Sequence, residues 1–132
     1  MICGKLPAFV VCSCFVFAGF ICSAQTLFFS NLSTRDGLPS NVLSAVVQDN
    51  HGFIWIGTAN GLARYDGYNF KTFKREENVN SLPGNEISCL LQKDEEVWVG
   101  TWQGLSKINT RNFKVTRVHL KENDIIRTLT AD

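Results

Sequence analysis

The feature that most constrains the fold of this chain is an internal repeat. The segment that begins at Leu38 is written again from Leu82, and Trp55 returns as Trp98, at a period of about 43 residues. Self-similarity at this period in a strand-rich sequence is typical of β-propellers and related repeat arrays. The matched strings are Leu38-Pro39-Ser40-Asn41 with Leu82-Pro83-Gly84-Asn85, Trp55-Ile56-Gly57-Thr58 with Trp98-Val99-Gly100-Thr101, Gly61-Leu62 with Gly104-Leu105, and Asn69-Phe70-Lys71 with Asn112-Phe113-Lys114.

The first 24 of the 132 residues are typical of a secretory signal peptide. Lys5 supplies the positive charge, an apolar run extends from Leu6 to Ile21, and Cys22-Ser23-Ala24 offers the small residues that signal peptidase prefers. Because the run is shorter than the roughly 18 to 20 residues needed to span a bilayer, cleavage before Gln25 is favoured over a retained anchor. The sequence therefore predicts an exported protein.

Charge and cysteine content after the signal peptide exclude several classes of partner. Without Lys5, the twelve basic side chains balance the twelve acidic ones. No basic stripe is present to hold a phosphate backbone, so we expect no contact with nucleic acid. Cys89 alone remains of the five cysteines, which excludes a disulfide framework. Its match to Ala45 predicts a small buried hydrophobe.

Each copy is predicted to form four strands joined by three short turns, which is one antiparallel propeller blade. In the first copy, Asn60-Gly61 and Asp66-Gly67 carry residues that tolerate positive φ, so type I′ turns are predicted there. In the second copy, the turns are expected at 94–96, 103–104 and 109–111. The expected strands are 42–48, 53–58, 62–65 and 68–73 in the first copy, and 87–92, 97–101, 105–108 and 113–118 in the second.

Several repeated residues are interpreted as structural. Glycine is unfavourable inside strands, so the recurrence of Gly57 as Gly100 predicts a bulge or a close backbone approach. Trp55 and Trp98 are expected to fill the space between blades. The full set assigned to the structural repeat is Trp55, Gly57, Thr58, Gly61, Trp98, Gly100, Thr101 and Gly104.

Both ends of the chain carry partial copies. The segment after Asn123 resembles the start of the second copy, and Leu27 to Leu32 is interpreted as a ring-closing fourth strand. Since propellers need about four to eight blades, we expect an incomplete propeller that is a fragment of a longer protein and poorly stable alone. The expected organisation is a signal peptide at 1–24, an orphan outer strand and connector at 25–37, blades at 38–80 and 81–122, and the start of a truncated third blade at 123–132.

The motifs together resemble the two-component regulator propeller repeat. The resemblance extends from about Leu27 to Asp132, with two departures: Glu95-Glu96 replaces an aspartate–glycine turn, and Trp102 replaces the Ala59 of the first copy. The strings that carry it are Thr34-Arg35-Asp36-Gly37-Leu38-Pro39-Ser40-Asn41, Ile54-Trp55-Ile56-Gly57-Thr58, Gly61-Leu62-Ala63-Arg64-Tyr65-Asp66-Gly67, Asn85-Glu86-Ile87-Ser88-Cys89-Leu90-Leu91, Val97-Trp98-Val99-Gly100-Thr101 and Gly104-Leu105.

The resemblance implies the N-terminal part of the periplasmic sensor region of a Bacteroidetes-type hybrid sensor histidine kinase. Such proteins carry two periplasmic propellers, an immunoglobulin-like segment and a span of the inner membrane, followed by kinase, receiver and DNA-binding modules. Many sense oligosaccharides and switch on the genes for polysaccharide breakdown. The implied partners are the rest of the propeller, an oligosaccharide and a second copy in a homodimer. A variant of this hypothesis couples the sensor to a cyclic-nucleotide output module.

No catalytic constellation is found in the two copies. His51 and His119 are too few and too far apart in the repeat to indicate a metal site. The turn aspartates Asp36, Asp49 and Asp66 are interpreted as caps of backbone donors. We therefore expect no catalytic residue, no metal and no cofactor.

The best candidates for ligand contact are positions where the two copies differ. Trp102 stands against Ala59, Arg64 against Lys107, and Tyr68 against Arg111. Trp102, Arg64 and Lys107 are therefore the candidate ligand-binding residues. Trp102 has two interpretations, a platform for a sugar ring or an aromatic cap on the blade.

The alternative function is an exported propeller enzyme, such as a carbohydrate-active lyase or hydrolase, because one scaffold hosts many activities. Paired carboxylates or calcium ligands converging on a central channel would favour this alternative. The two copies show neither pattern.

Overall fold

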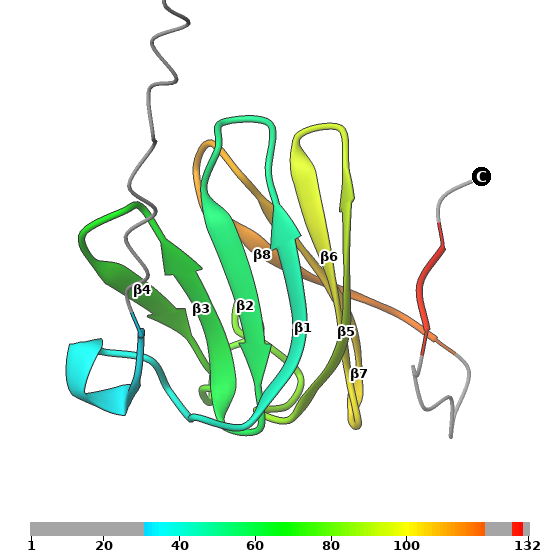
Figure 1. Cartoon of the computed structure of the whole chain (residues 1–132). Helices are drawn as coiled ribbons and strands as arrows, with labels where there is room; N and C mark the ends of the chain where they lie inside the picture. Colours follow the sequence, from blue (N-terminus) through cyan, green and yellow to red (C-terminus); the bar gives the residue numbers. More distant parts are fainter. Residues whose placement is uncertain (1–30, 121–127, 131–132) are drawn as a thin grey trace, which may run out of the picture. The chain divides into compact units, whose positions relative to one another are not determined.

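A computed structural model of the chain describes residues 31–120 and 128–130 (Figure 1). The expected signal peptide at 1–24, most of the expected ring-closing strand, and most of the expected third blade lie outside the described residues. Within them, the chain starts with the 3₁₀ helix η1 (Thr34–Asp36). The Ser33 N–H donates to Asp36 Oδ2 over 2.8 Å, so the predicted capping role of Asp36 is confirmed.

Two four-stranded antiparallel sheets form the rest of the described chain, as predicted (Figure 1). We call them blade 1 and blade 2. In each blade the strands are ordered as they occur in the sequence, which is a simple meander. Blade 1 comprises β1 (Leu43–Gln48), β2 (Ile54–Thr58), β3 (Gly61–Tyr65) and β4 (Phe70–Phe73), and blade 2 comprises β5 (Ile87–Lys93), β6 (Glu96–Thr101), β7 (Gly104–Asn109) and β8 (Val115–Val118).

The predicted type I′ turn at Asn60-Gly61 is wrong. Thr58 pairs with Gly61, so the loop consists of Ala59 and Asn60, and neither has a positive φ. Instead, Thr58 Oγ1 donates to the Gly61 carbonyl over 2.7 Å and accepts from the Asn60 N–H over 3.1 Å. A buried threonine hydroxyl therefore closes this turn, and the positive φ (125°) is needed only at Gly61.

Blade 2 repeats this turn in every detail. Thr101 Oγ1 donates to the Gly104 carbonyl over 2.9 Å and accepts from the Gln103 N–H over 3.2 Å. Thr101 is fully buried, and Gly104 has a φ of 142°. The repetition of threonine and glycine in the sequence is thus explained by one hydrogen-bonded turn.

The outer strands begin later than predicted because side chains take the backbone donors that precede them. Asp66 Oδ1 accepts from the N–H groups of Tyr68 and Asn69, over 2.9 and 2.7 Å, so β4 starts only at Phe70. The turn at Asp66 is therefore a four-residue loop, and the second predicted type I′ turn is also wrong. The capping role of Asp66 is confirmed. In blade 2, Asn109 Oδ1 binds the turn in the same way and β8 starts at Val115.

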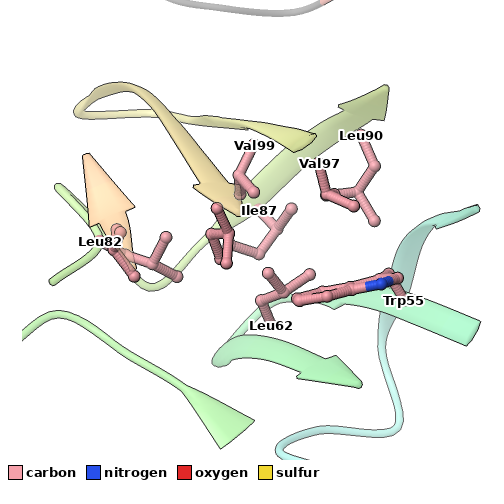
Figure 2. Packing of buried hydrophobic residues seen from close by; sticks show 9 residues of the cluster. Trp55, Leu62, Leu82, Ile87, Leu90, Val97 and Val99 are labelled. Atoms are coloured by element: carbon pink, nitrogen blue, oxygen red, sulfur yellow. The ribbon is translucent and has the colours of Figure 1, made fainter. Parts of the chain in front are cut away.

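The two sheets share one hydrophobic core, in which Trp55 and Leu62 of blade 1 face strands of blade 2 (Figure 2). Both side chains are fully buried. The indole N–H of Trp55 donates to Asp49 Oδ2 over 2.7 Å, so its one polar group is satisfied inside the core. The buried members of the cluster are Trp55, Leu62, Leu82, Ile87, Leu90, Val97, Val99, Ile108 and Val115.

Gly57 allows this close contact between the blades. A Cβ atom at this position would lie 2.7 Å from Cγ2 of Ile87 and 3.0 Å from Oγ of Ser44. Opposite Gly57, the register of β1 shifts between Leu43 and Ala45. The sequence predicted a bulge or a close approach at this glycine, and the structure contains both. The same register shift lies opposite Gly100, between Ile87 and Cys89.

Candidate functional site

A cleft lies where the β2–β3 turn of blade 1 and the β6–β7 turn of blade 2 come together. Its volume is about 290 Å³, and residues of both blades line it. The Trp102 N–H donates to the Glu86 carbonyl over 3.4 Å, and the Ala59 N–H donates to the Val42 carbonyl over 3.0 Å. These contacts tie each turn to the entry of the first strand in its own blade. The lining residues are Val42, Ser44, Ala59, Glu86, Ile87, Ser88 and Trp102.

Trp102 is the largest exposed side chain of this cleft. It stands in the loop that Thr101 closes, and 47% of its surface is exposed. The equivalent residue in blade 1, Ala59, lines the same cleft with a methyl group only. Because the two turns meet at the blade interface, the large residue and the small one leave open space between them.

Arg64, the second candidate, lies along β3 and contacts aromatic rings. Its guanidinium carbon is 4.0 Å from the centre of the Phe53 ring and 4.6 Å from that of Phe113. Phe53 belongs to the first repeat and Phe113 to the second, so this stacked cation joins the two blades. Its Nε atom is buried without a hydrogen-bond partner. These contacts give Arg64 a packing role at the blade interface.

Lys107, the third candidate, lies along β7 opposite Trp98. Its Nζ donates to Glu96 Oε1 over 2.8 Å and lies 5.6 Å from the centre of the Trp98 ring. The structure thus brings neither Arg64 nor Lys107 to the cleft beside Trp102. Ligand contact by the three residues stays a prediction, and only Trp102 lines an open cleft.

Glu86 and Ser44 are cleft residues that the sequence argument did not single out. A signal was available for Glu86, because it occupies the position that Val42 holds in the first copy. The rule that selected Trp102, a difference between copies in a turn region, would also have selected Glu86. Ser44 matches Ser88 in the second copy, so this rule could not have found it.

The opposite end of the blade interface carries a charged contact among three turns. Glu95 Oε1 accepts from Arg111 Nη2 over 3.0 Å, and Glu95 Oε2 lies 3.1 Å from both Arg111 Nε and His51 Nε2. The hydrogen bonds from Arg111, followed by that of His51, lower the pKa of Glu95 to about 2. Asn50 Nδ2 adds a bond of 2.6 Å to the Asp94 carbonyl. The contacts of His51 and Asn50 fasten the β1–β2 turn of blade 1 to the β5–β6 turn of blade 2, whereas those of Arg111 join the β7–β8 turn to the same turn within blade 2.

The turn that carries Glu95 differs in shape from its counterpart in blade 1. Lys93 pairs with Glu96, so Asp94 and Glu95 alone form the loop, and Asp94 has a φ of 53°. In blade 1, five residues separate β1 from β2, and Asp49 Oδ1 caps the N–H groups of His51 and Phe53. The predicted capping role of Asp49 is thus confirmed.

Within 31–120 and 128–130, no group of three or more His, Cys, Asp or Glu side chains is arranged to hold a metal ion. In the same part of the chain, no helix is long and apolar enough to cross a membrane.

Comparison with known proteins bears directly on the repeat. Residues 37–60 and 81–103 match the model of the two-component regulator propeller family. The chain is also similar to the solved extracellular domain of a hybrid two-component system from B. thetaiotaomicron, at 29% sequence identity and a TM-score of 0.64. The match covers 72% of this chain but 14% of that one, so this chain spans a small part of its neighbour's length. No protein of curated function matches the sequence. The expected resemblance and the propeller fold are confirmed.

Proposed function

Because both blades carry the two-component regulator propeller repeat, we propose that this chain is the N-terminal part of a ligand sensor in a two-component phosphorelay protein. The observation that carries the proposal is the match in sequence and fold to the extracellular domain of a hybrid two-component system. The sensor acts outside the cytoplasm, in the periplasm, and the protein is anchored in the inner membrane. Its ligands are oligosaccharides, and its output regulates genes for polysaccharide use.

The roles of the repeated residues support a binding module over an enzyme. Trp55, Gly57 and Thr58 are used in packing, close approach and turn closure, so the repeat itself builds the scaffold. The ion pairs of Glu95 and Glu96 join neighbouring turns and strands. We therefore propose that the segment is non-catalytic and needs no cofactor.

The partners proposed for this segment are the other blades of the propeller and a second copy of the whole protein in a homodimer. Exposed apolar side chains on blade 1 support the first of these. Leu43 and Val46 are both more than half exposed on the face that carries Ile56. A neighbouring blade is the natural cover for such a face.

The proposal is tested with the protein expressed with all the blades that its gene encodes. The purified sensor region is titrated with a panel of neutral and acidic oligosaccharides, and binding is measured by calorimetry. The rate of autophosphorylation of the membrane-bound protein is then measured with the same panel. We expect at least one oligosaccharide to bind and to change the phosphorylation rate.

Two results would contradict the proposal. Folded protein that binds no member of the panel is not an oligosaccharide sensor of this kind. Cleavage of the oligosaccharide by the purified sensor region, detected by chromatography of the products, would instead support the alternative, a propeller lyase or hydrolase.

A further inference from the structure

The cleft beside Trp102 has a size suited to a single small ring. Its volume of about 290 Å³ is at the lower end of the roughly 300–1,000 Å³ of small-molecule sites. Both blades contribute to its walls, with Val42, Ser44 and Ala59 from the first repeat and the rest from the second. Among the described residues, the lining of the cleft comes from these two blades alone.

The apolar part of the cleft suits the face of a sugar ring. Trp102 lines the cleft, 47% of the residue is exposed, and its indole is a flat, electron-rich surface. The C–H groups on one face of a pyranose are weakly positive and apolar, so they stack favourably on such a surface. The methyl group of Ala59 leaves room beside the indole, where a larger residue would close the cleft.

The polar part of the cleft determines which sugar fits. Glu86 is the one charged residue among the lining residues, and no described residue donates a hydrogen bond to its carboxylate. An ionised carboxylate only accepts hydrogen bonds, so it suits sugar hydroxyls. The carboxylate of a uronic acid would meet a like charge, and the described lining residues include no lysine or arginine to offset it.

We propose that this cleft binds one neutral pyranose unit, stacked on Trp102 and hydrogen-bonded to Glu86, and that it discriminates against acidic sugars. The proposal rests on the proposed function and deepens it, because it assigns both the location of a sugar subsite and the charge class of the sugar. Ser44 supplies a further hydroxyl on the blade 1 side of the cleft.

The test uses the protein with all its blades and two sets of probes, neutral tetrasaccharides (cellotetraose, mannotetraose and maltotetraose) and the acidic tetragalacturonate. We expect calorimetry to show binding of a neutral probe and weaker binding of tetragalacturonate. Trp102→Ala should lower the affinity for the neutral probe by about tenfold or more, which corresponds to about 1.4 kcal/mol of binding free energy. Trp102→Phe should restore part of the lost affinity. Glu86→Lys should narrow the preference for neutral over acidic probes.

Tyr68→Ala is the matched control, because Tyr68 is an aromatic residue that is 90% exposed in the β3–β4 loop and does not line the cleft. It should leave every affinity unchanged. If a neutral probe binds but Trp102→Ala and Glu86→Lys behave like Tyr68→Ala, the subsite is elsewhere and the sensor function stands. Stronger binding of tetragalacturonate than of every neutral probe overturns the charge assignment. Absence of binding by all four probes counts against the subsite and the sensor function together.

Discussion

Blades 1 and 2 carry equivalent residues in very different surroundings. On the face with Ile56 in blade 1, Leu43 and Val46 are 53% and 57% exposed. Their counterparts in blade 2, Ile87 and Leu90, are 2% and 8% exposed because they pack against blade 1. The same strand position is thus surface in one blade and core in the other.

The opposite face shows the reverse relation. Trp55 of blade 1 is fully buried against blade 2, whereas its counterpart Trp98 is only half-buried. The indole of Trp55 is hydrogen-bonded to Asp49, but the matching position in blade 2 is Lys93, which is no acceptor. Cys89, predicted to be a buried hydrophobe, is also only partly buried.

The comparison teaches that one repeat encodes two complementary faces, and that its neighbour decides whether each face becomes core. Blade 1 supplies the tryptophan face and blade 2 supplies the aliphatic face of the interface observed here. This is the nearest-neighbour stabilisation expected of repeat proteins. The changes in stability below are differences in the free energy of unfolding between each variant and the parent segment, residues 25–132. Because two blades alone are expected to be poorly stable, the measurements are made in an osmolyte such as trimethylamine N-oxide, which strengthens burial.

The largest difference is expected between the two tryptophans. Trp55→Ala should lower the free energy of unfolding by about 3–5 kcal/mol, because it leaves a cavity in the shared core. Trp98→Ala should cost about 1–2 kcal/mol, because only part of its surface is removed from water. Urea unfolding measures both. Equal losses of stability for Trp55→Ala and Trp98→Ala would contradict this expectation, because they would show that the two tryptophans are equally buried.

A smaller effect is expected when Gly57 gains a side chain. Gly57→Ala should destabilise by about 1–3 kcal/mol, because the new methyl overlaps Cγ2 of Ile87 across the interface. The partner variant Ile87→Ala removes the overlapping atom. A double-mutant cycle should therefore give a total loss smaller than the sum of the single losses. If the two losses of stability simply add, residue 57 does not interact with Ile87 across the interface, and Gly57 is needed only within its own strand.

The third prediction concerns the two cations on the third strands of the blades. Arg64→Met should destabilise by about 0.5–2 kcal/mol, because the guanidinium stacks between Phe53 and Phe113. Lys107→Met should change stability by about 0–1 kcal/mol, since its ion pair with Glu96 is about one-third exposed. Thermal denaturation of both variants provides the measurement. A larger loss of stability for Lys107→Met than for Arg64→Met would contradict the expectation that Arg64 is the more stabilising of the two cations.

The smallest effect is a pH dependence of the turn contact at Glu95. Hydrogen bonds from Arg111 lower the pKa of Glu95 to about 2, from an ordinary value of 4.5. A carboxylate with a lowered folded pKa stabilises the fold above its unfolded pKa, and this contribution is lost as the pH falls from about 4.5 toward 2.

Glu95→Gln should therefore lower the thermal midpoint slightly at pH 7 and flatten its fall between pH 5 and pH 2. Glu77→Gln is a suitable control, because no ion pair involving Glu77 is found among the described residues. Identical pH profiles for wild type and Glu95→Gln would show that the contact adds nothing to stability.

Much of the fold could be predicted because its signals are local. Runs of β-branched and aromatic residues located all eight strands with ends displaced by at most two residues. The turn types could not be predicted in this way, because the hydroxyl of Thr58 and the carboxylate of Asp66 compete for the backbone donors. That competition is settled by the register of the strands, which turn residues alone do not reveal.

The candidate site was less predictable than the fold. Differences between the copies selected both Trp102, which lines the cleft, and Arg64, which packs against two aromatic rings, and ligand contact by either stays a prediction. A difference between repeats identifies a changed environment, and the sequence does not distinguish a ligand from a neighbouring blade.

The sequence by itself determined the repeat, the number of strands in each blade and the approximate position of each turn, because these depend on contacts within about forty residues. Tertiary structure alone decided which copy of each apolar position is buried, and that Trp102 and Glu86 share a cleft. The physical reason is that burial and clefts belong to the interface between blades. Two repeats with the same pattern of apolar positions carry no local signal of which faces meet.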